Sequence, residues 1–334
     1  MKTLALTKKA IFSPSKIPLA AKIEFLTFLT ILQHGLPDIM LQFSGGIGDE
    51  LLLTAIAHEL KKNSPNIKIW QVSHSAGLLR NNPDYSQVFN WDYWFLRYSH
   101  LLDKQRCRLS YSEQLIPGEV ERPPDRHIIA ELCRKAGVRG EVSIRPYMYL
   151  TSEEKALGRM GNRQIVVQCV GEKSYENVMK NKLYPKENFQ KVIQLIREEL
   201  GTQDWKIIQL GGNGDQLLDA VVDLRGKTSL RQTAAIISQS DAFIGTQGFL
   251  AHLARAVDCR SVIIFGGREH SYQSGYSCNE NLDSYIDCAP CWRWNGCEYD
   301  RKCTTMIPPR QVFQGLVKVL EKRYALLETD LAIV

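Results

Sequence analysis

Short apolar strands alternate with amphipathic helices in two separate parts of this chain of 334 residues. In the first part, a strand at residues 38–43 leads through the glycine turn 45–48 into a helix that reaches Leu60, and a second strand follows at 67–72. This strand–turn–helix–strand order is typical of a βαβ unit, which implies a parallel sheet with a right-handed crossover. The alternation starts again after residue 162. The sequence therefore predicts an α/β fold with two Rossmann-like halves and with ligands at the carboxyl ends of the strands.

The length of the chain suits two domains of Rossmann size, because single hydrophobic cores stop growing at about 250–300 residues. Pro37 breaks the chain after a first helical segment, and the two halves join near residues 150–162. We expect a helical extension, two α/β domains and a last helix, at residues 1–37, 38–158, 159–308 and 309–334. A cysteine-rich segment, 288–303, lies within the second domain.

Charge and hydropathy narrow the class of protein. Hydrophobic residues make up 44% and charged residues 23% of the chain, which is typical of a globular protein. The net charge of +6 comes without a clustered basic tract of the kind that binds nucleic acid. No run reaches the roughly 18–20 apolar residues of a membrane span, and no secretory signal is visible. We therefore expect a cytoplasmic protein without a nucleic-acid partner.

Two segments have two interpretations each. Residues 17–33 are apolar but interrupted by Lys22 and Glu24, which indicates an amphipathic helix. Packing on the protein's own surface is the simpler interpretation, and peripheral contact with the inner membrane is the alternative. Residues 74–124 are irregular and contain the aromatic stretch FNWDYWFLRYSH. A core cluster and an aromatic binding cleft both fit this stretch, and we prefer the core cluster.

The first glycine turn ends in Asp49. The turn lacks the G-x-G-x-x-G spacing, and no acidic residue follows a second strand about 20 residues later, so an NAD-dependent Rossmann enzyme is poorly supported. A carboxylate at a helix start accepts backbone N–H bonds as an N-cap, and one that faces a cleft can act as a general base. The two roles are compatible.

Two places in the second half can hold phosphate. Lys180 and Lys182 follow a strand and precede a helix entered by Pro185, and a cation there can stabilise a developing negative charge. Two solvated loop lysines are the alternative. The glycine turn 245–248 precedes a helix that carries His252, and the unpaired N–H groups of its first turn can receive phosphate. A lone helical histidine is more often structural, but this one comes with a glycine turn and an amide.

Nine cysteines are many for a cytoplasmic chain, and four of them crowd one segment with the spacing C-x2-C-x5-C-x5-C. These four are Cys288, Cys291, Cys297 and Cys303. Four thiolates suit a structural zinc or iron site, although the later spacing matches no common zinc ribbon. Disulfides are disfavoured in a reducing cytosol, and four free cysteines remain the alternative. Buried thiols are the simplest interpretation of the scattered Cys107, Cys133, Cys169 and Cys259.

In their order along the chain, these elements resemble glycosyltransferase family 9, the ADP-heptose lipopolysaccharide heptosyltransferases and their relatives. The resemblance covers about residues 38–320. The stretch GGIGDELLLTAIAHEL resembles the family's G-D-x-L element, with Ala55 where proline is usual, and NKLYPKENFQKVI resembles its K-x-[WY]-P element. The stretch from DLRGKTSL to FLAHLARAV resembles its longest signature. The cysteine segment is similar to the C-x-P-C segment of many relatives.

The resemblance implies a GT-B fold, in which two Rossmann-like domains face a central cleft. Residues 38–158 would bind the acceptor and residues 159–308 the nucleotide sugar, with inverting transfer and no catalytic metal. By position, Asp49 matches the general base and Lys182 the lysine that contacts the donor phosphate, and these two are the candidate catalytic residues. The candidate donor-binding residues are Gly46, Lys182, Asp215, Thr246, Gln247, Gly248 and His252.

Part of the last signature departs from the family pattern. Gln247 stands where many members have an acid that contacts the donor sugar, and Gly248 and Phe249 stand where they have Ser or Thr and Gly. An amide both donates and accepts hydrogen bonds, so its recognition of sugar hydroxyls need not match that of an acid. The pattern predicts phosphate binding without naming the donor sugar.

The resemblance thus predicts an inverting glycosyltransferase that moves a heptose-like sugar from a nucleotide-diphosphate donor, ADP-linked, to a hydroxyl of a cell-surface glycan or glycolipid, as in lipopolysaccharide biosynthesis. Asp49 would take the acceptor's proton, while Lys182 and the helix start near Gly248 would stabilise the leaving diphosphate. The alternative is a non-catalytic nucleotide-sugar-binding or scaffold protein that keeps the fold. The departures at 247 and 249 favour that alternative, which predicts donor binding without transfer.

Overall fold

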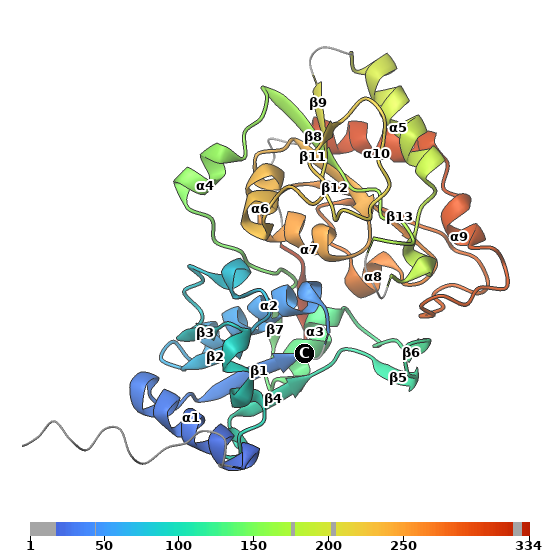
Figure 1. Ribbon diagram of the computed structural model, residues 1–334. Helices are drawn as coiled ribbons and strands as arrows, with labels where there is room; N and C mark the ends of the chain where they lie inside the picture. Colours follow the sequence, from blue (N-terminus) through green and yellow to red (C-terminus); the bar gives the residue numbers. More distant parts are fainter. Residues whose placement is uncertain (1–17, 44, 175–177, 202–204, 323–328) are drawn as a thin grey trace, which may run out of the picture.

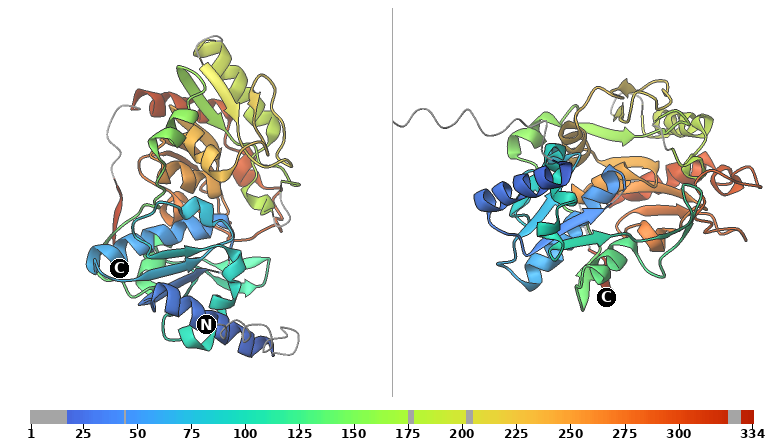
Figure 2. Two further views of the ribbon diagram at one scale, coloured as in Figure 1. Left: turned by 60° about the vertical axis from the view of Figure 1, so that its left-hand side comes forward. Right: turned by 60° about the horizontal axis from the view of Figure 1, so that its bottom comes forward.

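The computed structural model describes residues 18–43, 45–174, 178–201, 205–322 and 329–334. Two α/β halves are visible, one below the other, in Figure 1 and in the left view of Figure 2. The chain passes from the lower half to the upper half by way of α4 (Ser152–Leu157). The expected pair of Rossmann-like halves is confirmed.

The first half contains a four-stranded sheet made of β1 (Ile39–Phe43), β2 (Ile69–Val72), β3 (Gln87–Phe89) and β4 (Arg106–Leu109). The order is β3-β2-β1-β4, and every pairing is parallel. Successive residues of a strand point to opposite faces, so the sheet needs a cover on both sides. Leu41 packs against α2 (Ile47–Asn63) and α3 (Ile128–Lys135). Met40 packs on the other face, against the 3₁₀ helix η3 (Trp91–Arg97).

The second half contains a six-stranded sheet made of β8 (Arg163–Val167), β9 (Trp205–Gln209), β10 (Val222–Asp223), β11 (Ala242–Thr246), β12 (Ser261–Gly266) and β13 (Glu280–Asp283). The order is β10-β9-β8-β11-β12-β13, again all parallel. Two helices cover each face: α5 (Lys186–Glu199) with α10 (Pro309–Glu321), and α6 (Leu230–Ser238) with α7 (Phe249–Ala256). Because both faces are covered, β11 and β12 are buried along their whole length.

The remaining elements are short. They are η2 (Ala76–Leu79), η4 (His100–Leu102), η5 (Lys180–Lys182), α8 (Ser271–Ser274), α9 (Lys302–Thr305), the hairpin of β5 (Glu113–Ile116) and β6 (Val120–Arg122), and the pair β7 (Glu141–Ser143) and β14 (Leu331–Ile333). The hairpin reaches the second half through its backbone. The N–H of Glu121 donates to the carbonyl of Trp292 at 3.1 Å, and the N–H of Trp294 donates to that of Glu119 at 2.8 Å.

The C-terminal residues differ from the simple helix expected at 309–334. α10 is helical, but β14 pairs antiparallel with β7 of the first half. Beyond the strand, the N–H of Gly140 donates to the carbonyl of Val334 at 3.1 Å. The chain therefore ends on the first half, where Figure 1 marks the C-terminus. This pairing joins segments far apart in sequence, so no local pattern announces it.

α1 (Leu19–His34) packs one side against the first half and leaves another side exposed. Its inner residues lie against the cluster around Trp70 and Phe89, while Glu24 accepts the N–H of His100 at 2.8 Å and so caps η4. The exposed apolar residues are Leu19, Phe25, Phe28, Leu29 and Leu32. No helix among the described residues is long and apolar enough to cross a membrane.

The aromatic stretch of the first half divides between core and surface. Phe89 and Phe95 are buried in the cluster beneath the sheet, as the core interpretation predicts. Trp91 and Tyr98 stay exposed, by 37% and 58% of their surface. Trp91 stacks on His74 at 3.6 Å between ring centres, and the cleft interpretation stays a prediction for these two residues.

Each half contributes side chains to the core of the other. Leu51 of α2 is fully buried in the cluster beneath α6 and α7 of the second half. In return, Tyr276 and Trp292 of the second half are buried in the cluster around α2 and α3. The two halves are therefore joined by apolar packing as well as by the chain.

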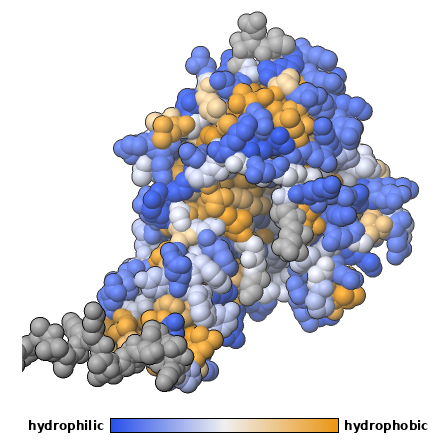
Figure 3. Space-filling model, viewed as in Figure 1, coloured by the Kyte–Doolittle hydropathy of each residue, from blue (hydrophilic) through white to orange (hydrophobic). Residues whose placement is uncertain are grey.

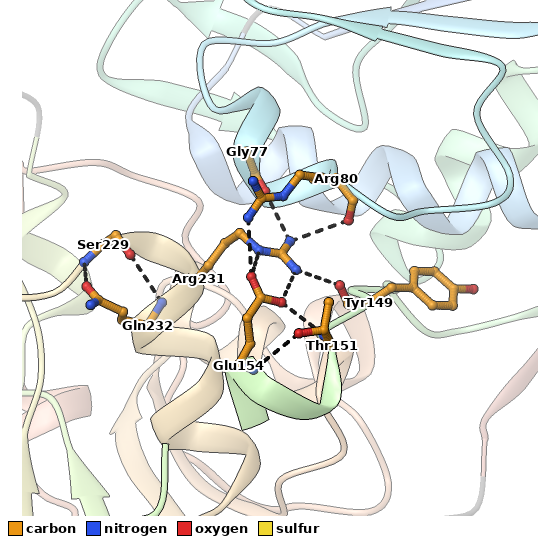
Figure 4. A network of polar contacts seen from close by, with 8 residues as sticks. All are labelled: Gly77, Arg80, Tyr149, Thr151, Glu154, Ser229, Arg231 and Gln232. Carbon is orange, nitrogen blue, oxygen red and sulfur yellow. Dashed lines mark hydrogen bonds and ion pairs between the residues drawn. The ribbon is translucent and has the colours of Figure 1, made fainter. Parts of the chain in front are cut away.

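A buried arginine also connects the two halves through hydrogen bonds (Figure 4). Arg231 of α6 donates to both carboxylate oxygens of Glu154 at 2.5 Å, and to the carbonyls of Gly77 and Tyr149 at 3.1 and 2.8 Å. Arg80, which is exposed, reaches the same carboxylate at 3.3 Å. Arg231 thus ties α6, α4 and η2 into one network, and its hydrogen bonds hold the pKa of Glu154 at about 2.

Candidate active site

The starts of α2 and α7 meet between the two sheets. A Cβ atom on Gly48 would contact the backbone of Phe249, with 3.5 Å to its Cα atom. The glycine turn of the first half therefore faces the glycine turn of the second half at close range. Figure 3 shows a hollow between the two halves, with hydrophobic side chains on one wall. Both helix starts lie at this region, and the first N–H groups of a helix have no partner within the helix.

Asp49 presents its carboxylate at the start of α2. One oxygen accepts the N–H of Gly46 at 2.8 Å, and the other accepts the hydroxyl of Tyr111 at 3.0 Å. A Cβ atom on Gly45 would lie 2.1 Å from the carboxylate, so that position requires glycine. Desolvation raises the pKa of Asp49 to about 6, against the two hydrogen bonds and the nearby Lys182, which lower it. The carboxylate can therefore take up a proton near neutral pH.

The expected capping role of Asp49 needs a correction. The N-cap residue of α2 is Gly46, and Asp49 is the third helical residue. α2 starts at Ile47, earlier than the sequence pattern suggests, and the side chain of Asp49 reaches back to the N–H of Gly46 as in a capping box. The carboxylate still satisfies a free N–H group at the helix start.

A series of ion pairs connects Lys182 of the second half to the hairpin of the first half. Lys182 lies 2.9 Å from Glu269, whose carboxylate also accepts Arg268 at 2.5 Å and the hydroxyl of Ser274 at 2.6 Å. Arg268 continues to Glu121 of β6. Burial disfavours the ionised form of Glu269, but Lys182 and Arg268 outweigh it and hold the pKa at about 2. Burial lowers the pKa of Lys182, and Glu269 opposes that change.

The candidate donor-binding residues of the second half lie at the carboxyl ends of adjacent strands. Thr246 ends β11, and Gln247 and Gly248 form the turn into α7. Gln247 is 7% exposed, and its Oε1 atom has no hydrogen-bond partner among the described residues. Asp215 follows β9 and accepts Gln168, which follows β8, at 3.3 Å. The sheet order places β9, β8 and β11 side by side, so these residues share one edge.

His252 is buried beneath this turn. Its Nδ1 atom lies 2.7 Å from the hydroxyl of Tyr276, and only 5% of the residue is exposed. Desolvation lowers the pKa of His252 to about 3, so the ring is neutral at physiological pH. A neutral, buried ring can orient neighbouring groups, but it adds no positive charge for a phosphate.

The four clustered cysteines do not form a ligand set for a metal. All nine cysteines carry free thiols, and Cys288 and Cys297 are exposed whereas Cys303 is buried. Burial raises the pKa of Cys291 and of Cys303. No group of three or more His, Cys, Asp or Glu side chains in the described ranges is arranged to hold a metal ion.

The structure brings Asp49, Lys182 and the turn at Gly248 into one region, whereas His252 lies below it and Asp215 along the strand edge. Several residues of the region were missed from the sequence: Tyr111, Glu121, Arg268, Glu269 and Ser274. One signal was present, because Arg268 and Glu269 directly follow the glycine pair that ends the strand SVIIF. Nothing local marked Tyr111, which belongs to the irregular segment.

A family model now bears on this geometry. The model of glycosyltransferase family 9 (heptosyltransferase) matches residues 140–297. These residues are similar to a glycosyltransferase family 9 domain. This match confirms the resemblance seen in the sequence motifs, and with it the expectation of a glycosyltransferase. A comparison with curated proteins gives no match.

Solved structures of glycosyltransferases share the fold. The ADP-heptose lipopolysaccharide heptosyltransferase II of E. coli is similar with a TM-score of 0.62 and 14% identity, over 86% of this chain and 100% of that one. For the family 9 glycosyltransferase of Veillonella parvula the values are 0.60, 14%, 86% and 97%. For the iron-containing dodecameric glycosyltransferase TibC of enterotoxigenic E. coli they are 0.62, 15%, 86% and 77%. The architecture of this glycosyltransferase is therefore GT-B, as expected.

Proposed function

We propose that this family 9 glycosyltransferase moves a heptose-like sugar, with inversion, from an ADP-linked donor to a hydroxyl group of a cell-surface glycan or glycolipid. The observation that carries the proposal is the Asp49 carboxylate. Its pKa is raised to about 6, and it stands at a helix start that faces the glycine turn of the second half. The family model supports sugar transfer, and a structure of TibC holds ADP-D-β-D-heptose, which supports the choice of donor.

In the proposed reaction, Asp49 accepts the proton of the acceptor hydroxyl while that oxygen attacks the anomeric carbon. The bond from this carbon to the diphosphate breaks, and the diphosphate leaves with the electron pair. Lys182 and the N–H groups at the start of α7 stabilise the negative charge that develops there. Lys182 must exchange Glu269 for the diphosphate, because the carboxylate is its partner at 2.9 Å.

The base assignment is tested by Asp49→Asn, with Asp125→Asn as a control at a carboxylate that is 77% exposed. Transfer from ADP-D-β-D-heptose to heptose-free lipopolysaccharide is measured, and ADP binding is followed by calorimetry. We expect kcat to fall at least about 100-fold in Asp49→Asn with unchanged ADP affinity. Near-normal turnover in this variant would contradict the assignment. ADP binding without transfer in the wild-type protein would favour the non-catalytic alternative.

The role of Lys182 is tested beside its neighbour. Lys182→Met should weaken ADP binding about tenfold or more, because a charge-assisted contact to phosphate is lost. Lys180 is an exposed lysine that pairs with Glu172 at 3.2 Å, so Lys180→Met serves as the matched control and should change the affinity less than about twofold. Equal effects of the two substitutions would show that Lys182 has no specific role.

Two finer proposals concern the rest of the chain. The spacing of the four clustered cysteines supports a structural zinc or iron ion, which would require their side chains to turn toward one another. Metal analysis of the purified protein tests this proposal, and metal-free protein contradicts it.

The exposed apolar side of α1 supports peripheral contact at the cytoplasmic side of the inner membrane. Co-sedimentation with anionic vesicles tests it, and equal binding by Phe25→Ser/Phe28→Ser would contradict it.

A further inference from the structure

A second polar pocket opens at the carboxyl end of the first sheet, apart from Lys182 and the turn of α7. It has a volume of about 390 Å³ and is lined by Gln42, Arg97, Tyr98, Arg108 and Leu109. Gln42 and Arg108 are register partners on the adjacent parallel strands β1 and β4. Arg97 ends η3, Tyr98 follows it, and Leu109 ends β4. None of these residues belongs to the candidate site described above.

The pocket has hydrogen-bond donors and positive charge without a counter-charge. Among the described residues, neither Arg97 nor Arg108 forms an ion pair with a carboxylate. Arg97 donates to the carbonyl of Phe43 at 3.2 Å and lies 5.3 Å from the centre of the Trp91 ring, so its head group is held in place. Gln42 is 6% exposed, and its Nε2 atom has no partner in the described part of the chain. A buried amide donor without a partner is costly unless a ligand receives it.

The pocket adjoins the proposed catalytic carboxylate. Phe43 lies between the pocket and Asp49. Its carbonyl accepts Arg97, while its ring lies 5.4 Å from the ring of Tyr111, whose hydroxyl donates to Asp49. The pocket therefore lies at the carboxyl edge of the half that we propose to bind the acceptor, and Phe43 and Tyr111 connect it to Asp49. The donor diphosphate would lie across the cleft, at Lys182.

We propose that this pocket binds an anionic substituent of the acceptor, a phosphate or a carboxylate group. That the anion belongs to the acceptor rests on the proposed function, whereas the anion site itself does not depend on it. Two guanidinium groups and an amide N–H match the oxygen atoms of either anion, and guanidinium groups bind both in a bidentate manner. The exposed Tyr98, which follows Arg97 and also lines the pocket, can contact the sugar ring that carries the anion.

Binding of small anions to the full chain tests the proposal directly. The probes are inorganic phosphate, glucose 6-phosphate and glucuronate, with glucose as the uncharged comparison, measured by calorimetry in the presence of saturating ADP so that the donor site is filled. The variants are Arg108→Gln and Arg97→Gln. Lys104→Gln is the matched control, because this exposed lysine precedes β4 and so lies at the opposite edge of the sheet.

We expect the charged sugars to bind and glucose not to bind, with an affinity loss of about tenfold in Arg108→Gln and no change in Lys104→Gln. Arg108 is exposed and makes no ion pair in the described ranges, so its substitution leaves the fold intact. The comparison of sugar phosphate with uronate decides which anion fits, and binding of inorganic phosphate alone would place the site outside acceptor recognition and overturn the proposal. Unchanged binding in both arginine variants, or no binding of any probe, would also overturn it.

The failure of this proposal is separate from that of the proposed function. Anion binding is measured without transfer, so a protein without transferase activity can still show the site. Conversely, heptose transfer with a normal KM for the acceptor in Arg108→Gln would leave the glycosyltransferase proposal in place and remove the anion site. A rise in acceptor KM at unchanged kcat is the kinetic result that we expect from Arg108→Gln.

Discussion

Asp49 combines a structural and a chemical role in one carboxylate. Its hydrogen bond from Gly46 completes the start of α2, and its second oxygen receives Tyr111. Desolvation in the closed region between the halves raises its pKa to about 6, and the two hydrogen bonds keep it from rising further. General bases are most efficient when their pKa lies near the working pH, because they are then both deprotonated and able to hold a proton. The environment therefore suits the role that the family resemblance implies.

The hydroxyl of Tyr111 is expected to set the working pH of this base. Its hydrogen bond favours the ionised form of Asp49, so Tyr111→Phe should raise the pKa of Asp49 above about 6. Since the base must be deprotonated, the acid limb of the profile of kcat/KM against pH should move upward. Activity at pH 6 should fall severalfold and recover at pH 8.

The control for this prediction is Tyr299→Phe, at a tyrosine that is 52% exposed. It should leave the profile unchanged. If Tyr111 only supported the packing of Phe43 and Trp292, then Tyr111→Phe would lower the rate equally at every pH. A profile of unchanged shape would therefore contradict the positioning role of Tyr111.

At this scale the sequence identified residues next to glycine turns and missed those from irregular segments. Asp49 and Gly248 lie at the starts of the helices after β1 and β11, and Lys182 lies in the segment between β8 and α5, so their place near the strand ends could be predicted from the alternation alone. Tyr111 and Glu269 lie in the same region because the two halves pack together and the hairpin pairs with residues 292–294. Docking of this kind depends on contacts distant in sequence, which single-residue patterns do not contain.

At the scale of elements, the joint around Arg231 fixes how α6, α4 and η2 lie against one another. The guanidinium group is 9% exposed and binds Glu154 with two hydrogen bonds, each of 2.5 Å. A buried charged group that loses its partner destabilises a protein strongly, whereas an exposed pair contributes little. Arg80 reaches the same carboxylate, and its side chain is 63% exposed. The network therefore contains a buried and an exposed arginine that bind one carboxylate.

Arg231→Gln should therefore lower the free energy of unfolding by about 1–3 kcal/mol, and Arg80→Gln by less than about 0.5 kcal/mol. Urea unfolding at pH 7 measures both values. The pKa of Glu154 is lowered from 4.5 to about 2, so its ion pair stabilises the fold above pH 4.5 and loses this effect as the pH falls toward 2. The difference between wild type and Arg231→Gln should shrink below pH 4. Equal losses in the two variants would contradict the assigned roles.

The elements themselves were largely predictable, because long buried strands and amphipathic helices leave a periodic signal. The strands β8, β11 and β12 each contain a run of apolar residues, and α5 and α10 show a clear apolar side. β14 was missed because three residues with partly exposed side chains carry almost no pattern, and their partner β7 lies nearly 190 residues earlier. The β5–β6 hairpin was missed for the same reason, since β5 is exposed along its length.

For the whole molecule, the exchange of core residues between the halves is expected to make them unfold together. Leu51 of the first half is fully buried in the core of the second, Trp292 of the second half is buried in the core of the first, and β14 adds a strand across the boundary. Interfaces between domains that merely touch allow separate unfolding, but a shared core does not.

Leu51→Ala is the sharpest probe of this coupling. Loss of a fully buried leucine typically costs about 2–5 kcal/mol, and this one packs against the other half. We expect the wild type to show one urea transition by circular dichroism and by tryptophan fluorescence, which reports on Trp70 in the first core and Trp205 in the second. Leu51→Ala should move both signals together to lower urea, whereas Leu157→Ala, at a side chain that is 79% exposed, should move neither. Two separate transitions, or a shift of only one signal in Leu51→Ala, would show that the halves fold independently.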